Sequence, residues 1–354
     1  MLNDVLSTFG FDANQYTIHQ LGTGLINHTW KLTDNKGEDK FMLQQLNKSV
    51  FKSPYHIAEN TEKIKQYLLQ RHPNYLFAAP LPTTTGETLV KSNEEYYRLF
   101  LFIKSSTTIT TVQTPGGAYE AANQFGQFTR LLSQFDINRL HYTLPGFHNI
   151  SARFIQFQQA IKTANPDRLN LAKESIAKVL THQDIAKAYE NIVADKLIPL
   201  RVIHHDTKIS NVLFDTNSKG LCVIDLDTVM PGYYISDVGD MMRTYLSPVN
   251  EEERDLVKIK VREDFFTTIT QGYLNQMGGV LTDIEKNLFV YSGKFMIYMQ
   301  ALRFLTDHLN NDVYYGAAYT GHNLARAKNQ LTLLEKYLEA GDKFQQIVDT
   351  CINE

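Results

Sequence analysis

The feature that most constrains the fold of this chain is a change in hydrophobic periodicity shortly after residue 100. Before it, YTIHQLGTGLINHTWKL (16–32) reads as two strands around a pair of glycines, and DKFMLQQLN (39–47) reads as a third strand. From about residue 115 onward, most segments repeat their apolar residues at helical spacing. The sequence therefore predicts a small strand-rich part followed by a large helical part.

The strand-rich part has a predictable order of helices and strands. Residues 1–10 indicate a short helix, and DNKG (34–37) is a turn of the hairpin type. A helix is predicted over 56–72, where apolar residues recur at helical spacing. Two further strands follow at ETLV (87–90) and EYYRLFLFI (95–103), joined by the turn KSN. This order predicts a small α+β lobe.

The helical part contains one exception. Helical periodicity covers 118–135, 152–164, 166–194 and most of 252–347, whereas 201–232 mixes short apolar runs with carboxylates. Loops that a rigid scaffold holds are where chemistry tends to be placed. We therefore expect the functional residues to gather in this island.

Composition excludes several classes of protein. The chain has 35 Lys and Arg against 38 Asp and Glu, and this balance argues against a nucleic-acid partner. The two cysteines, Cys222 and Cys351, are typical of a reducing compartment. The N-terminus does not read as a signal peptide, and no apolar run is long enough to span a bilayer. We expect a soluble, cytoplasmic protein with no membrane partner.

The island holds a pattern of oxygen-bearing side chains. HHDTKISN (204–211) is followed by two short apolar strands and then by VIDLD (223–227). DTNSKG between the strands supplies turn residues, so a hairpin brings Asn211 opposite Asp225. An amide oxygen and a carboxylate are hard ligands suited to Mg²⁺, which also binds substrate phosphates. We predict that Asn211 and Asp225 hold Mg²⁺.

Asp206 begins the same loop and is placed to take a proton from an attacking hydroxyl group. Lys208 offers a cation beside it that can balance charge on a transferring phosphoryl group. The order D-x-x-x-x-N, hairpin, D is the phosphoryl-transfer layout of protein kinases, and His204 supplies the H of its H-x-D loop. We predict Asp206 and Lys208 as catalytic residues.

Some island residues have two interpretations. His204 fits a packed, hydrogen-bonded loop anchor better than a proton carrier. His205 is either solvent-facing or a substrate contact, and Asp227 is either a second metal ligand or a hydrogen-bonded loop carboxylate. A zinc site is the rival reading, but adjacent histidines in an extended loop point to opposite sides and no further His or Cys follows at ligand spacing.

The motif resembles the aminoglycoside phosphotransferase and choline kinase group of small-molecule kinases. The resemblance is closer to N-acetylhexosamine 1-kinases, and it runs over essentially the whole chain. The segments that carry it are PLRVIHHDTKISNVLFD (199–215), LCVIDLDTVMPG (221–232), DVGDMMR (237–243), FHN (147–149) with Arg153, RFLTDHL (303–309) and NLARAKNQ (323–330).

The resemblance implies a two-lobed, protein-kinase-like α+β fold. Its lobes would be a β-rich nucleotide lobe at 1–103 and a mainly helical lobe at 104–354, with FLFIKSS as the hinge. It also implies that Asp237 braces the backbone of the catalytic loop. Arg303 and the pair Tyr314–Tyr315 lie in the region that this family uses around its sugar; ordinary helix-end packing is the competing explanation.

For the nucleotide, the resemblance implies ATP beneath Gly22, Thr23 and Gly24, whose backbone amides can approach phosphates closely. The adenine would lie near Phe102. Protein kinases place a lysine on the third strand, but Gln44 or Gln45 occupies that place here, so the usual lysine–glutamate pair has no counterpart. Similar glutamines occur in the hexosamine kinase group.

These observations predict an ATP- and Mg²⁺-dependent kinase that phosphorylates the anomeric hydroxyl of an N-acetylhexosamine. Leu25 and His28 differ from the His and Asp expected in that group, so the choice of sugar stays open. The alternatives are a kinase of another small hydroxylated metabolite (an amino alcohol, an aminoglycoside or a homoserine-like compound), a non-catalytic nucleotide-binding relative, and a metal-dependent hydrolase.

Overall fold

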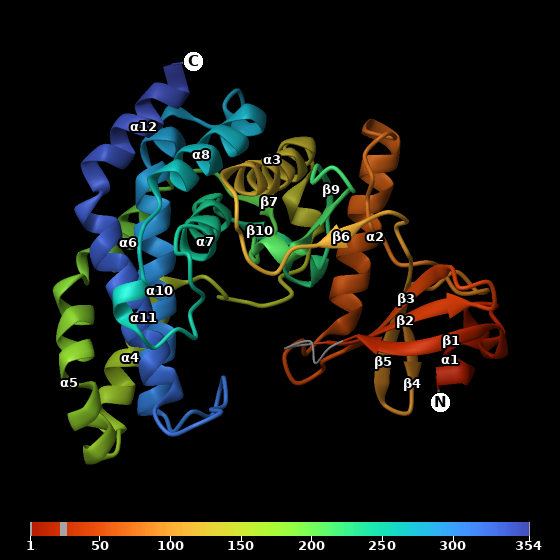
Figure 1. Ribbon diagram of the computed structural model, residues 1–354, viewed down its shortest axis with the longest axis horizontal. Coiled ribbons are helices and arrows are strands. Elements are labelled where there is room, and N and C mark those ends of the chain that lie inside the picture. The colour runs from red at the N-terminus through yellow and green to blue at the C-terminus, as the bar shows by residue number, and fades with distance from the viewer. Residues whose placement is uncertain (1, 22–26, 354) are drawn as a thin grey trace. The chain divides into compact units, whose positions relative to one another are not determined.

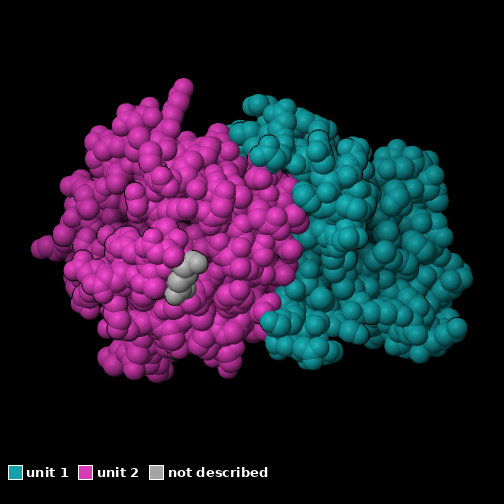
Figure 2. All heavy atoms as spheres, turned by 90° about the horizontal axis from the view of Figure 1, so that it is seen from above, with its two compact units in different colours: residues 1–107, 134–145, 213–231 teal, residues 108–133, 146–212, 232–354 magenta. Residues whose placement is uncertain are grey.

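The computed structural model describes residues 2–21 and 27–353, which divide into two compact units. Unit 1 comprises the chain up to residue 107 together with 134–145 and 213–231; unit 2 comprises 108–133, 146–212 and the chain from 232 onward. Figure 2 colours the two units. Lobes at 1–103 and 104–354 stay a prediction.

Unit 1 is built on a five-stranded antiparallel sheet with the strand order β1-β2-β3-β5-β4 (Figure 1). Its strands are β1 (Tyr16–Leu21), β2 (His28–Asp34), β3 (Asp39–Leu46), β4 (Val90–Ser92) and β5 (Glu95–Leu101). Short helices α1 (Leu2–Thr8) and η1 (Ala13–Gln15) precede the sheet.

The two faces of this sheet differ because side chains alternate along each strand. Leu32, Leu43 and Leu99 point to one face and form a buried core with Val5 and Leu6 of α1. The other face presents a polar row, since Thr29, Gln44 and Arg98 are paired across β2, β3 and β5. The polar row includes Gln44, one of the residues predicted to bind the nucleotide.

Helix α2 (Pro54–Arg71) also belongs to unit 1. Pro54 lies in its first turn, where the missing amide hydrogen costs no helical bond. Ile57, Ile64 and Leu68 are buried at helical spacing, and Asn60 is buried on the same helix. The buried face of the helix is therefore mainly apolar, with Asn60 and Thr61 as its buried polar side chains.

The predicted hairpin is present. Strands β8 (Val212–Phe214) and β9 (Gly220–Val223) are neighbours, and the turn between them closes through Asp215, whose backbone amide bonds the Lys219 carbonyl. A short 3-10 helix, η4 (Leu226–Thr228), and β10 (Met230–Gly232) follow. Asn211 thus lies directly before β8, and Asp225 lies between β9 and η4.

Unit 2 is mainly helical. Its long helices are α3 (Pro115–Leu131), α4 (Ile150–Thr163), α5 (Pro166–Thr181), α6 (Asp184–Ala194), α7 (Ile235–Tyr245), α8 (Glu263–Met277), α10 (Phe289–Leu309), α11 (His322–Glu339) and α12 (Gly341–Asn353). Its short elements are β7 (Arg201–Ile203), η3 (Ile209–Asn211), η5 (Leu256–Lys258) and α9 (Asp283–Asn287). The almost wholly buried α10 packs against α4, α7 and α11. None of the helices within 2–21 and 27–353 is long and apolar enough to cross a membrane.

The expected α+β class, with an antiparallel sheet early and helices after it, is confirmed. Two boundaries differ from expectation. The strand expected at 87–90 lies at β4, because Asn93 and Glu94 form the hairpin turn with φ values of 49° and 63°. The segment 166–194 is two helices, since α5 ends at Thr181 and α6 begins at Asp184.

Candidate active site

The loop that follows β7 is held by a carboxylate from a neighbouring helix. The backbone amides of His204 and His205 donate hydrogen bonds to the two oxygens of Asp237, at 2.8 and 2.7 Å. His205 has a φ of 66°, a region costly for a side chain other than glycine. The bracing role that the resemblance implied for Asp237, near the start of α7, is therefore confirmed.

Asp240, one turn further along α7, continues this support. Its carboxylate accepts a hydrogen bond from the backbone amide of Thr207 at 2.9 Å, while the Thr207 hydroxyl donates to the Asp237 carbonyl at 2.8 Å. The Tyr245 hydroxyl donates to the carbonyl of Thr207. Helix α7 thus fixes the residues on both sides of Asp206, which leaves the Asp206 side chain to be oriented by its own neighbours.

Asp206 forms an ion pair with Lys208 at 2.9 Å. Burial raises the pKa of the Asp206 carboxyl, but the Lys208 ammonium, His204 and a hydrogen bond from Asn211 outweigh it, so that the pKa lies below its ordinary value. Asp206 is therefore ionised at neutral pH. An ionised carboxylate is what a proton acceptor requires.

Asn211 turns its side chain back into the same loop. Its amide nitrogen donates to the backbone carbonyl of Asp206 at 2.9 Å, and the side chain is buried. Because the nitrogen is used inside the loop, the amide oxygen is the atom left to face a cation. The arrangement fits a hard oxygen ligand for Mg²⁺.

His204 is fully buried, and its ring lies edge-on to Phe125 and Phe128 of α3, at centroid distances of 5.1 and 6.4 Å. The backbone amide of Asp206 lies 3.4 Å from its Nδ1. These contacts favour the packed-anchor interpretation of His204.

A second group of side chains in unit 2 combines cations and aromatic rings. This aromatic–basic cluster consists of Phe147, His148, Arg153, His205, Arg303, Tyr314 and Tyr315. The Arg303 guanidinium lies 5.2 Å from the Phe147 ring centre and 5.4 Å from that of Tyr315. The structure thus brings together all four residues predicted to bind the acceptor.

The link between His205 and the rest of the cluster passes through two rings. Phe147 stacks on His148 at 4.3 Å, and the His148 ring lies 5.3 Å from that of His205. Since His205 precedes Asp206 directly, the cluster adjoins the catalytic loop. Phe147 and His148 belong to a segment that carries the family resemblance, but the sequence predicted no role for either.

Hydrogen bonds from α10 and α11 hold the backbone of the segment that carries Tyr314 and Tyr315. Asp307 of α10 accepts hydrogen bonds from the backbone amides of Tyr314 and Tyr315, at 2.7 and 2.9 Å. Asn323 of α11 donates to the Asp307 carboxylate and to the Gly316 carbonyl, at 3.1 and 2.9 Å. These contacts fix the backbone of the segment after α10, and the substrate role of the two tyrosines stays a prediction.

The charged side chains of the aromatic–basic cluster are the two arginines, Arg153 and Arg303. Burial and the charge of Arg303 lower the pKa of Arg153. Burial, His205 and Arg303 hold the pKa of His148 well below its ordinary value, so His148 is neutral at pH 7. Within the described residues, the hydrogen-bond partners of Arg153 and Arg303 are neutral groups: Gln156, the Phe147 carbonyl, Gln300 and Tyr314. Arg153 and Arg303 are thus the sources of positive charge within the cluster.

In unit 1, Gln44, one of the two glutamines predicted in place of the strand-3 lysine, belongs to a polar network. The Gln44 side-chain oxygen accepts from Arg98 at 3.1 and 2.8 Å, and its nitrogen donates to the Thr29 hydroxyl at 3.3 Å. Arg98 also pairs with Asp227 at 2.5 Å, and Asn27 donates to Asp227 at 2.8 Å. These contacts favour the loop-carboxylate interpretation of Asp227.

The remaining predicted residues are placed as follows. Asp225 has a φ of 61° and begins the turn of η4. The Phe102 amide donates to the Lys40 carbonyl at 2.8 Å, at the end of β5. Gly22, Thr23 and Gly24 lie outside the described residues. The roles of Asp225, Phe102 and these three residues stay predictions.

Arg98 was missed by sequence reasoning, although a signal was present. It is the one charged residue inside the apolar run YYRLFLFI. A charge in an otherwise apolar strand is buried only when it is paired. Its partner, Asp227, could not be assigned from sequence because the two lie on distant segments.

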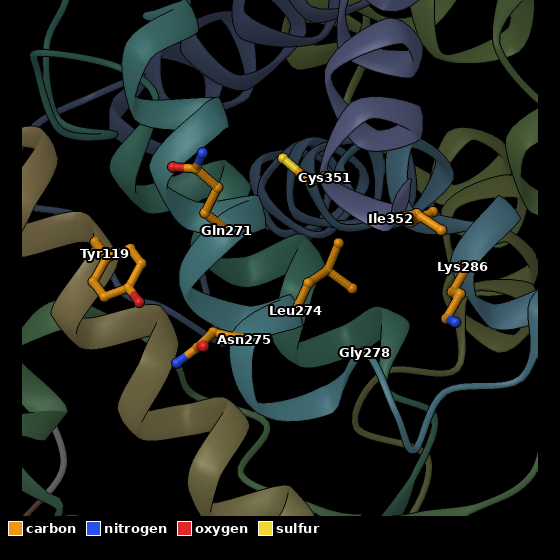
Figure 3. A pocket seen from close by; sticks show the side chains of 8 residues that line it. All are labelled: Tyr119, Gln271, Leu274, Asn275, Gly278, Lys286, Cys351 and Ile352. Atoms are coloured by element: carbon orange, nitrogen blue, oxygen red, sulfur yellow. The ribbon is translucent and has the colours of Figure 1, made fainter. Parts of the chain in front are cut away.

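One described cavity lies apart from these residues. Tyr119, Gln271, Leu274, Asn275, Gly278, Lys286, Cys351 and Ile352 line a volume of about 450 Å³ (Figure 3). It contains none of the predicted site residues. Across residues 2–21 and 27–353, no three side chains from His, Cys, Asp and Glu are grouped as a metal ion would require; a ligand pair of one Asn and one Asp falls outside that set.

The fold of this chain is similar to that of several solved small-molecule kinases. An amicoumacin kinase in complex with AMP-PNP, Ca²⁺ and amicoumacin is 16% identical, with a TM-score of 0.60 over 97% of this chain and 92% of that one. A spectinomycin phosphotransferase in complex with ADP and spectinomycin is 14% identical, with a TM-score of 0.61 over 98% of each chain. A choline kinase from Cryptosporidium parvum is 14% identical, with a TM-score of 0.54 over 96% and 94%. The fold is therefore that of the kinase-like phosphotransferases.

A comparison of the sequence with family models identifies the family, which is narrower than the fold. Residues 17–262 match the phosphotransferase enzyme family (APH), and this span is more than half of the chain. The chain belongs to that family. The resemblance expected from the catalytic-loop motif is confirmed at this level.

Proposed function

We propose that this protein transfers the γ-phosphoryl group of ATP to the anomeric hydroxyl of an N-acetylhexosamine. The observation that carries the proposal is the catalytic loop: an ionised Asp206 beside Lys208, braced through its backbone by Asp237 and Asp240. Membership of the phosphotransferase enzyme family supports the reaction type.

In this mechanism Asp206 accepts the proton of the acceptor hydroxyl as its oxygen attacks the γ-phosphorus. The new P–O bond forms in line with the bond that breaks, and ADP leaves with the electron pair of the bridging oxygen. Lys208 is the cation nearest to Asp206 and would balance charge on the transferring group. Positioning and electrostatics supply most of the rate in such a reaction.

Asn211 and Asp225 are the residues that would hold Mg²⁺. Asn211 uses its nitrogen inside the loop and keeps an oxygen for the ion, and Asp225 follows the hairpin that starts at Asn211. When bound, Mg²⁺ neutralises charge that develops on the phosphate oxygens. For the nucleotide itself, the proposal retains Gly22, Thr23, Gly24, Gln44 and Phe102.

The aromatic–basic cluster supports an oxygen-rich acceptor over a cationic one. Arg303 and Tyr314 can donate to hydroxyl groups and to the acetamido carbonyl, and aromatic faces suit the apolar face of a sugar ring. An amino alcohol or aminoglycoside would bring its positive charge against Arg153 and Arg303. A site for such acceptors would be expected to contain carboxylates instead.

One observation favours a second candidate acceptor. The described hydrogen-bond partners of Arg153 and Arg303 are neutral, and burial together with the charge of Arg303 lowers the pKa of Arg153. A hexosamine that itself carries a carboxylate would supply the missing negative charge. This candidate uses the same catalytic loop and the same chemistry.

The test is a panel of acceptors with Mg·ATP: neutral N-acetylhexosamines, a carboxylate-bearing hexosamine, and amino alcohols. Phosphorus NMR reads the position that is phosphorylated. We expect an anomeric phosphate on one of the first two classes. A phosphate on a primary hydroxyl, or turnover of amino alcohols alone, would refute the hexosamine 1-kinase assignment.

The same assay tests the base. Asp206→Asn should keep the fold, because the loop backbone is held by Asp237 and Asp240 and not by Asp206. Turnover should fall by roughly 10²- to 10⁴-fold, the usual contribution of a general base. Near wild-type turnover in this variant would contradict the role of Asp206. Thermal unfolding of the two proteins serves as the control.

A further inference from the structure

Arg98 is a buried cation on the polar face of the unit 1 sheet. Its side chain is 5% exposed, and its guanidinium donates twice to the Gln44 oxygen on the neighbouring strand β3. Gln44 or Gln45 is predicted at the position where protein kinases carry their strand-3 lysine, and Gln44 is the one of the two that contacts Arg98. The charge that this position lacks is therefore supplied from β5, directly beside it.

The anionic partner of Arg98 lies in the η4 turn. Asp227 is 2% exposed and pairs with the Arg98 guanidinium through one oxygen, while Asn27 donates to its other oxygen at 2.8 Å. Asn27 in turn accepts a hydrogen bond from the Asn47 backbone amide at 3.0 Å. One oxygen of Asp227 thus accepts a hydrogen bond, and the other is held by the ion pair with Arg98.

Helix α2 holds the other end of the same turn. The Asn60 side chain donates to the carbonyls of Val229 and His141, at 3.2 and 2.8 Å, and accepts from the His141 amide at 2.8 Å. The turn is therefore tied to β5 at Asp227 and to α2 at Val229. In protein kinases a lysine–glutamate ion pair joins the third strand to the following helix.

The turn needs such support because of the residue that begins it. Asp225 is in the left-handed region, with a φ of 61° and a ψ of 59°, where a residue other than glycine is strained. Strained conformations persist when the surrounding structure determines them. Asp225 lies two residues before Asp227, so holding Asp227 in place restricts the backbone conformation that Asp225 can adopt.

We propose that Arg98 is a positioning residue, which fixes Asp225 for its role as a cation ligand by holding Asp227 in the η4 turn. The Arg98–Asp227 pair takes over the function of the absent lysine–glutamate pair without contacting the nucleotide phosphates. This inference rests on the proposed function, in which Asp225 binds Mg²⁺.

The experiment measures ADP affinity by calorimetry with and without Mg²⁺, so it requires no knowledge of the acceptor. In the wild-type chain we expect Mg²⁺ to strengthen ADP binding. In the double variant Arg98→Met/Asp227→Leu, the strengthening by Mg²⁺ should fall at least tenfold, while ADP affinity in EDTA stays within about twofold of wild type. Arg98→Lys should restore part of the effect, because it keeps the charge but not the paired donors to Gln44.

The double variant separates positioning from folding. Arg98→Met alone leaves Asp227 buried without its cation and should lower the melting temperature, whereas removing both charges should recover it. Glu95→Gln is the matched control: Glu95 lies on the same strand and pairs with Lys48 near the surface, so its loss should leave the Mg²⁺ effect unchanged.

Three outcomes would overturn the role of Arg98. If the double variant keeps the wild-type response to Mg²⁺, the pair does not position Asp225. If its affinity for ADP in EDTA falls by the same factor as in Mg²⁺, Arg98 contacts the phosphates itself. If wild-type ADP binding does not respond to Mg²⁺ at all, the proposed kinase chemistry fails and this role fails with it.

Discussion

Asp206 and Lys208 are two residues apart in a loop whose backbone is already fixed by Asp237 and Asp240. Burial alone would raise the pKa of Asp206, and the Lys208 ammonium is the largest of the effects that lower it. The low pKa of the base therefore depends more on Lys208 than on His204 or Asn211. This dependence can be measured directly.

Replacing Lys208 by Met should move the acid limb of the pH profile of kcat/KM to higher pH. In the wild-type chain the folded pKa of Asp206 lies below its unfolded value of about 4, so this carboxylate stabilises the fold above that pH. That contribution is lost as the pH falls through the lowered pKa. Without Lys208, burial acts with less opposition and the folded pKa rises.

The control for this prediction is Lys208→Arg, which keeps the positive charge and should keep the acid limb near its wild-type position. The rate itself should fall in both variants if Lys208 also contacts the transferring group, so the position of the limb and not the rate is the readout. An unchanged limb in Lys208→Met would mean that Lys208 does not set the pKa of Asp206.

At the scale of elements, helix α7 connects the catalytic loop to the centre of unit 2. It carries Asp237 and Asp240 on the side of the loop and Gly239 on the side of α10. A Cβ atom on Gly239 would collide with the Ser292 carbonyl and with Met296. The close approach of these two helices therefore requires glycine at this position.

Gly239→Ala should destabilise the protein by about 1–3 kcal/mol, the usual cost of an extra methyl group in a packed core. Because a shift of α7 also moves Asp237 and Asp240, turnover should fall as well. Denaturant unfolding and steady-state kinetics give the two readouts. Gly341→Ala is the matched control, since nothing lies within 4 Å of a Cβ there, and it should have little effect on either.

Elements also show where hydrophobic periodicity is not a sufficient guide to the ends of helices and strands. The two helices α5 and α6 appear as one periodic segment because both bury apolar residues at the same spacing; the break at His182 and Gln183 carries no proline or glycine signal. Strand β4 lies later than expected because Asn93 and Glu94, not the residues before them, adopt positive φ values. Local turn chemistry decides such boundaries.

At the scale of the whole molecule, ligand binding should be visible as stability. Mg·ADP at one hundred times its dissociation constant should stabilise the folded chain by about 2.7 kcal/mol, provided that the unfolded chain does not bind it. The melting temperature should rise, and EDTA should remove the part of the rise that depends on the metal. Differential scanning calorimetry measures both.

Asn211→Ala is the variant that tests the metal part of this effect. It should lose the response to Mg²⁺ but keep the smaller stabilisation by ADP in EDTA. A full Mg²⁺ response in Asn211→Ala would exclude this residue from the ion site. The variant also removes the hydrogen bond to the Asp206 carbonyl, so its melting temperature without ligand is the reference.

The sequence by itself determined the α+β class, the strands and helices of most of the chain, and the catalytic loop with its hairpin. These features depend on residues close together in sequence: alternation in strands, helical spacing, turn residues and the step from Asp206 to Asn211. Local interactions of this kind leave a pattern that can be read without a structure.

Only the tertiary structure decided which buried charges meet. Asn27 and Asp227 are 200 positions apart, and Arg98 reaches Asp227 from a strand that reads as apolar. Phe147 and Arg303 are also far apart in the sequence, and they are brought into contact by the packing of unit 2. A buried charge must find a partner, but its own residue type does not specify where along the chain that partner lies. That choice is made when distant elements pack.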